Sequence, residues 1–153
     1  MNFKISVFLA SLIFISFSFV SCQKGSGTAS SNYGQHKSHN HGKACLHCHG
    51  TGGDNEFWWK IGGSIYKSDL TTYNPNGTVY LFKGKGSAGV LVKTIEVDGN
   101  GNIFTSSDIP LTDSLYVALQ NASGDVKYMP IGTLDLNCNN CHDGKTNPRI
   151  WIK

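Results

Sequence analysis

The chain has 153 residues, with 13 Lys and Arg, 10 Asp and Glu, and a charged fraction of only 15%. This length fits one domain. A formal net charge of +3 is too small to indicate a nucleic-acid-binding surface or a partner attracted mainly by charge. We therefore expect no nucleic acid among the partners, and a function that depends on particular side chains.

Residues 1–21 have the pattern of a lipoprotein signal peptide. Lys4 provides a short positive region, and residues 5–20 are an almost unbroken run of apolar residues and serines. The run is short for a membrane-spanning helix and suits a signal peptide better. It ends at Phe19-Val20-Ser21-Cys22, which resembles the lipobox of bacterial lipoproteins, so we expect acylation of Cys22. The mature protein would then be lipid-anchored in the bacterial cell envelope, at the outer membrane or facing the periplasm. Ordinary cleavage that leaves Cys22 as a thiol is the alternative.

Residues 22–42 are rich in Gly, Ser, Asn, Lys and His. Such a segment buries too little apolar surface to fold alone, so we expect a flexible tether between the lipid and a domain at 43–153. Its second half contains three candidate metal ligands, because neutral imidazole is a common ligand. These are His36, His39 and His41. A solvated His-rich arm is the alternative interpretation.

The domain carries the pattern Cys-x-x-Cys-His twice. The first motif is 45–49 and the second motif is 138–142. This is the attachment signature of a c-type haem, in which two thiols on one backbone turn bond the porphyrin and the adjacent imidazole ligates the iron. We therefore expect two covalently attached haem c groups. The thioether bonds would be made by Cys45, Cys48, Cys138 and Cys141, and the proximal ligands would be His49 and His142.

The cysteine count has two other interpretations. The four motif cysteines could form disulfides in an exported protein, although a disulfide framework gives no reason for a histidine after both pairs. They could instead bind zinc or act as dithiols. Zinc-binding pairs usually lie closer in sequence than Cys48 and Cys138, which 89 residues separate. Both stay open as alternatives to haem attachment.

The sixth iron ligands are not assigned by the sequence. The histidines of the 36–41 cluster are candidates, and so is Met129, the chain's one methionine besides Met1. A lone methionine on a predicted strand can instead be a core residue. Met/His ligation raises the reduction potential of a haem, so the potentials stay open as well.

Between the motifs, alternating apolar residues and turn signals predict an all-β domain, an antiparallel sandwich with a haem-binding segment at each end. Gly62-Gly63 indicates a bulge or a close backbone approach. Asp98 to Gly101 has the composition of a hairpin turn, and alternation places Leu91 on one face with Ile95 and Val97. With six strands and simple up-down connections, the two motifs should lie near one another. The predicted strands are 57–67, 78–83, 89–97, 102–106, 113–120 and 125–131.

Parts of the sequence resemble a known family. The runs at 65–66, 78–80 and 97–105 resemble the carboxypeptidase-regulatory or prealbumin-like sandwich. The segments that follow the motifs, 50–53 and 147–150, resemble exported bacterial multihaem c-type cytochromes built on that sandwich. The resemblance covers roughly residues 39–153 and implies electron transfer in the cell envelope, in some cases within larger redox conduits.

These observations favour a lipid-anchored dihaem cytochrome that relays single electrons between redox partner proteins and is not an enzyme. Reduction of a small molecule at an open iron position is an alternative, although no nucleophile-base pairing or other cofactor signature is present. A structural alternative is a subunit of a haem-containing assembly. In that case a histidine of the 36–41 cluster would ligate iron in a neighbouring copy, and the protein would self-assemble.

Overall fold

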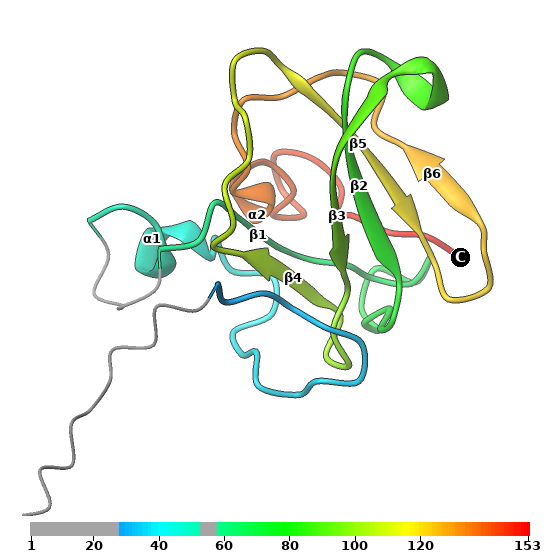
Figure 1. Ribbon diagram of the computed structural model, residues 1–153. Helices are drawn as coiled ribbons and strands as arrows, with labels where there is room; N and C mark the ends of the chain where they lie inside the picture. Colours follow the sequence, from blue (N-terminus) through cyan, green and yellow to red (C-terminus); the bar gives the residue numbers. More distant parts are fainter. Residues whose placement is uncertain (1–27, 53–57) are drawn as a thin grey trace, which may run out of the picture.

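The computed structural model describes residues 28–52 and 58–153. This part of the chain is all-β, with its strands in two antiparallel sheets, which confirms the predicted fold class (Figure 1). The predicted signal peptide and Cys22 lie outside the described residues. Within the described ranges, no helix has the length and apolar character needed to cross a membrane.

The larger sheet has four strands in the order β3-β2-β5-β6. Alternating apolar residues explain why these segments form strands with one buried face. The side chains of Val79 and Leu81 in β2, and of Leu115 and Leu119 in β5, point to that face. Each strand lies within or close to its predicted range. The strands are β2 (Thr78–Lys83), β3 (Val90–Glu96), β5 (Leu115–Gln120) and β6 (Val126–Tyr128), and the short 3₁₀-helix η1 (Gly86–Ala88) joins β2 to β3.

The smaller sheet pairs β1 (Ile61–Ser64) with β4 (Asn102–Thr105), so the first strand is shorter than the predicted 57–67. The other side of β1 is not left open. Gly62 forms a parallel bridge with Asn137, and its N–H donates to the carbonyl of Leu136 at 3.1 Å. The chain segment that leads into the second motif therefore runs beside β1.

The hydrophobic core lies between the two sheets. Both sheets contribute aliphatic side chains that are almost completely buried, and the segments after β4 and near the C-terminus cover the remaining sides. Its members are Ile61, Ile65, Val79, Leu81, Ile95, Val97, Ile103, Ile109, Leu115, Leu119, Leu136 and Ile152. β1 is thus anchored in the core by Ile61 while its two glycines face the motifs.

Leu91 does not share a face with Ile95 and Val97, contrary to the prediction from simple alternation. Ile95 and Val97 are buried, whereas the side chain of Leu91 is 51% exposed. The β2–β3 register shifts between Leu81 and Phe82, so that Leu91 pairs with Phe82. One extra residue in a strand reverses the facing of everything beyond it, which explains the exposure of Leu91.

The turn at 98–101 forms as predicted, but it does not join two strands of one hairpin. The carboxylate of Asp98 accepts the N–H groups of Asn100 and Asn102, both at 2.9 Å, and Gly101 has the positive φ of 79° that the turn requires. Beyond the turn the chain separates, since β3 pairs with β2 and β4 pairs with β1. The turn therefore carries the chain from one sheet to the other.

Residues 28–42 are docked on the domain, which corrects the prediction of a flexible tether for this part of 22–42. Ser30 bridges Thr105, and the N–H of Ser31 donates to the carbonyl of Phe104 at 2.9 Å. Further along, the N–H of Gly42 donates to Ser64 Oγ at 2.9 Å. Composition suggested a free segment, but the backbone hydrogen bonds offered by the edge of β4 hold it in place.

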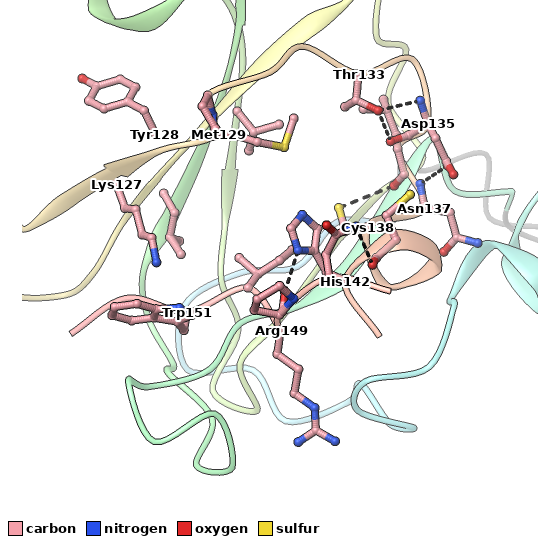
Figure 2. Close-up of a pocket in the computed structure, with 18 residues that line it drawn as sticks. Lys127, Tyr128, Met129, Thr133, Asp135, Asn137, Cys138, His142, Arg149 and Trp151 are labelled. Atoms are coloured by element: carbon pink, nitrogen blue, oxygen red, sulfur yellow. Dashed lines mark hydrogen bonds between the residues drawn. The ribbon is translucent and has the colours of Figure 1, made fainter. Parts of the chain in front are cut away.

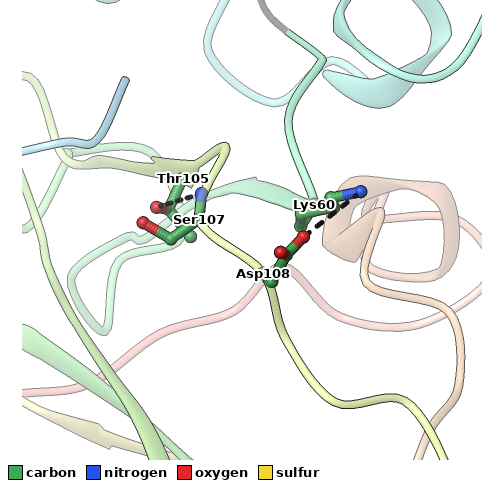
Figure 3. A network of polar contacts seen from close by, with 4 residues as sticks. All are labelled: Lys60, Thr105, Ser107 and Asp108. Carbon is green, nitrogen blue, oxygen red and sulfur yellow. Dashed lines mark hydrogen bonds and ion pairs between the residues drawn. The ribbon is translucent and has the colours of Figure 1, made fainter. Parts of the chain in front are cut away.

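The approach to β1 lies beside the end of β4, where Figure 3 draws the hydrogen bond between Ser107 and Thr105 and the ion pair between Lys60 and Asp108. The N–H of Lys60 donates to the carbonyl of Thr105 at 2.7 Å, and the hydroxyl of Thr105 accepts the N–H of Ser107 at 3.1 Å. Lys60 also pairs with Asp108 at 3.7 Å. Both side chains of that ion pair are exposed, and such pairs contribute little to stability.

Substitution of two leucines in the larger sheet tests the register shift between β2 and β3. We expect Leu81→Ala to lower the free energy of unfolding by about 2–5 kcal/mol, because it leaves a cavity in the core. Leu91→Ala should cost less than about 1 kcal/mol, because that side chain is largely in solvent. Equilibrium unfolding in urea measures both, and equal losses would contradict the register shift.

Candidate cofactor-binding site

The two motifs form the same backbone turn. The helix α1 (Leu46–His49) and the helix α2 (Cys138–Cys141) are each one turn long. The N–H of His49 donates to the carbonyl of Cys45 at 3.0 Å, and the N–H of His142 donates to the carbonyl of Cys138 at 2.9 Å. Each turn brings both thiols and the histidine of a motif together, as a Cys-x-x-Cys-His spacing requires for haem attachment.

The two motifs are far apart in sequence, but both pack against the same strand, β1. A Cβ placed on Gly62 would lie 2.7 Å from the Cβ of Cys45, and one placed on Gly63 would lie 2.7 Å from the Cβ of Cys138. Figure 1 accordingly draws α2 next to β1. The expected meeting of the two ends is present, but the topology is not a simple up-down series. The motifs meet because Cys45 packs against Gly62 of β1 and the segment before α2 runs beside the same strand.

A cavity of about 310 Å³ adjoins the second motif (Figure 2). Cys138, Cys141 and His142 lie on its wall. This volume is in the range of small-molecule and cofactor sites, which are mostly apolar with few polar groups. Much of the remaining lining is apolar and comes from β5, the end of β6 and the C-terminal segment. It includes Val117, Leu119, Met129, Leu136, Ile150 and Trp151.

The imidazole of His142 is held in one tautomer. Its Nδ1 lies 2.7 Å from the carbonyl oxygen of Pro148. Because a carbonyl can only accept, Nδ1 carries the proton and donates it, which leaves the lone pair on Nε2. Histidines that bind metals are usually oriented by a hydrogen bond of this kind. His142 is therefore prepared to ligate a metal through Nε2.

At the first motif the histidine lies at the end of a stack of aromatic rings. The ring of His49 stacks on Trp59 at a centroid distance of 3.8 Å, and Trp59 stacks on Phe104 at 4.2 Å. Burial, and then the neighbouring charge of His39, lower the pKa of His49. A lowered pKa favours the neutral imidazole, which is the form that binds metals. Residues 53–57, which follow this motif, lie outside the described residues.

The three histidines of the 36–41 cluster occupy different places. The ring of His39 lies 5.8 Å from that of His49 between centroids. A ring this close to a motif histidine could provide a second imidazole to a group that His49 would hold. His36 instead contacts Asn100 Oδ1 through Nδ1 at 2.8 Å. His41 stacks on Tyr73 at 3.9 Å. The structure brings His39, and neither of the others, to the ring of a motif histidine.

Met129 lies at the second motif rather than in the core. It lines the same cavity as His142, and Figure 2 draws its thioether on the wall above the imidazole. Its N–H donates to the carbonyl of Val117 at 2.8 Å, which continues the pairing of β6 with β5. The backbone of Met129 is thus fixed by the sheet while its side chain borders the cavity.

Burial suppresses ionisation of the first thiol in each motif. Desolvation, and then the neighbouring charge of Cys45, raise the pKa of Cys138 to about 12. Desolvation also raises the pKa of Cys45. Cys45, Cys138 and Cys141 are not joined in disulfides. Across residues 28–52 and 58–153, no three His, Cys, Asp or Glu side chains form a group suited to a metal ion.

A polar network around Ser64 was not predicted from the sequence. The N–H of Ser64 donates to the side-chain oxygen of Asn139, which lies inside the second motif, at 2.8 Å. Its hydroxyl donates to Asn102 Oδ1 at 2.5 Å and accepts the N–H of Gly42, which precedes the first motif. The only signal in the sequence was the adjacent Gly62-Gly63, because partners so distant in sequence leave no local pattern.

No family model, curated protein or solved structure matches this chain. Its function is therefore inferred from its own residues and their arrangement.

Alkylation tests the environment of the thiols. In chain made without haem attached, we expect iodoacetamide to modify Cys138 at least tenfold more slowly than the exposed Cys141 at pH 8. The thiolate is the reacting form, and a pKa of about 12 leaves about one Cys138 thiol in ten thousand ionised at this pH.

Because the pH stays below that pKa, each added unit up to pH 10 should accelerate the modification of Cys138 about tenfold. Peptide mass mapping measures both sites. In urea the two rates should converge. A Cys138 rate that levels off near pH 9 in the folded chain would contradict the assignment.

Proposed function

We propose that this protein is a dihaem c-type cytochrome that relays single electrons between redox partner proteins in the bacterial cell envelope. The observation that carries the proposal is at the second motif. An apolar cavity lies beside two cysteines, and the histidine that follows them has its Nε2 lone pair available because Nδ1 donates to Pro148. The repeated turn at the first motif supports a second group of the same kind.

Each motif supplies the same attachment chemistry. Cys45 and Cys48 would bond one haem, and Cys138 and Cys141 the other. A bound haem supplies a one-electron ferric/ferrous couple. The residues of the chain would orient the haem and limit its contact with water. At the second site the cavity walls provide the apolar surroundings, and the Pro148 carbonyl fixes the ring of His142.

The sixth ligands differ between the two sites in this proposal. His39 would complete the first site because its ring lies beside that of His49. Met129 would complete the second because it shares the cavity with His142. Met/His ligation raises the reduction potential above that of paired imidazoles. The second site would therefore be the electron-accepting end of the pair.

The proposed lipid anchor at Cys22 would keep the domain near the membrane. Residues 28–42 are docked on the domain, so only residues 22–27 could act as a linker. A fully extended chain spans about 3.5 Å per residue, which limits six residues to roughly 20 Å. This reach would confine electron exchange to partners at or close to the same membrane. The resemblance to exported bacterial multihaem cytochromes supports this location.

Haem counting tests the proposal. Full-length protein produced in a host with haem-attachment machinery should contain two haems per chain by pyridine haemochrome. Replacing both cysteines of either motif by Ala should leave one haem. Lys60→Ala, outside the motifs, is the control and should leave two. A colourless product with unmodified motif peptides would refute the proposal.

Ligand substitutions test the proposed difference between the sites. Met129→Leu should remove the far-red sulfur-to-iron absorption band and lower the higher of the two midpoint potentials, while both haems stay attached. Leu134→Ala, an exposed neighbour on the same connection, is the control. His39→Ala should alter the ligand-field spectrum of the first haem, whereas His36→Ala should not. Persistence of the far-red band in Met129→Leu would exclude this ligand.

A further inference from the structure

We propose that Gly62 and Gly63 are positioning residues that hold the two attachment motifs against one strand as a fixed, closely spaced pair. This rests on the proposed function, because it concerns how the two groups are placed relative to each other. It assigns to β1 a role beyond its place in the small sheet.

Space, rather than backbone conformation, requires glycine at both positions. Neither Gly62 nor Gly63 has a positive φ, so a larger residue could adopt the same backbone. Glycine inside a strand weakens it, and such residues often mark a close approach of other groups. Here the approach is that of the two cysteines. A Cβ on Gly62 would also lie 3.4 Å from Cys45 Sγ, and one on Gly63 would lie 3.1 Å from Cys138 Sγ.

The two contacts fall on opposite faces of the strand. Successive residues of a strand point their side chains to opposite sides, and their Cα atoms are 3.8 Å apart. With each cysteine Cβ 2.7 Å from the corresponding Cβ position, the Cβ atoms of Cys45 and Cys138 are on the order of 10 Å apart. Groups bonded to these sulfurs would therefore be attached at neighbouring points.

Hydrogen bonds around the strand fix this spacing. Asn137 Oδ1, just before the second motif, accepts the N–H of Leu46 in the first at 3.4 Å. On β1, Ser64 links Gly42 to Asn139 through its hydroxyl and N–H. Asn139 is only 3% exposed, so this connection is buried. The motifs are thus connected through Asn137, which adjoins the second motif, and through Ser64, the residue that follows the two glycines.

Substitution of the glycines gives a motif-specific test in full-length protein with haem attached. Gly62→Ala should reduce haem attachment at the first motif at least fivefold and leave the second loaded. Gly63→Ala should do the reverse. Gly77→Ala is the matched control, because its added Cβ would meet a backbone oxygen at 2.5 Å, away from both motifs. Peptide mass mapping measures the loading of each motif.

A second measurement does not depend on the glycine variants folding. The electron paramagnetic resonance spectrum of the oxidised wild-type protein should show interaction between two ferric haems. It should therefore differ from the sum of spectra of the two single-haem proteins, made by replacing both cysteines of one motif with Ala.

The outcomes separate this inference from the proposed function. Two haems in the wild type, with a spectrum equal to that sum, would overturn the fixed pair while leaving the cytochrome intact. Alanine at both glycines with loading like that of Gly77→Ala would overturn the positioning role. Absence of haem from the wild type would remove the proposed function itself, and this inference with it.

Discussion

The close packing of two cysteines against adjacent glycines of β1 is the constraint on which the arrangement of this molecule depends. Cys45 and Cys138 approach Gly62 and Gly63 so closely that neither position has room for a Cβ. Because β1 is also paired with β4 and anchored in the core by Ile61, the strand is a rigid support. The sandwich can therefore be understood as a frame that brings two short cysteine-containing turns together.

The two motifs share a backbone turn but differ in their surroundings. At the second motif, an apolar cavity and the Pro148 carbonyl leave an imidazole nitrogen available, with a thioether on the cavity wall. At the first motif, His49 stacks on Trp59 and a second imidazole lies beside it. Under the proposed function, these differences would give two like cofactors unlike potentials. The fold would then set the direction of electron transfer between the two cofactors as well as hold them close together.

The docking of residues 28–42 also bears on how this domain would be attached to a membrane. A segment with the composition of a linker is held by backbone hydrogen bonds to β4 and by the contact of Gly42 with Ser64. It carries His39 to its place beside His49. The segment would serve as part of the first site and not only as a connection to the lipid.

The sequence by itself determined the local features. Alternation located the strands, the turn at 98–101 followed from its Asp, Asn and Gly residues, and the Cys-x-x-Cys-His spacing predicted one backbone turn at each motif. These depend on contacts between residues near in sequence, which a local pattern records. Gly62-Gly63 indicates a bulge or a close backbone approach, and the structure shows the close approach, although the sequence does not identify its partners.

Only the tertiary structure decided which distant groups meet. A register shift reversed the facing of Leu91, the pairing of β4 with β1 turned a predicted hairpin into a crossing between sheets, and edge hydrogen bonds ordered the supposed tether. The placement of His39 and Met129 at different motifs likewise arises from long-range packing. Such contacts depend on how whole strands pair and which backbone groups remain open to new partners, and no short window of sequence contains that information.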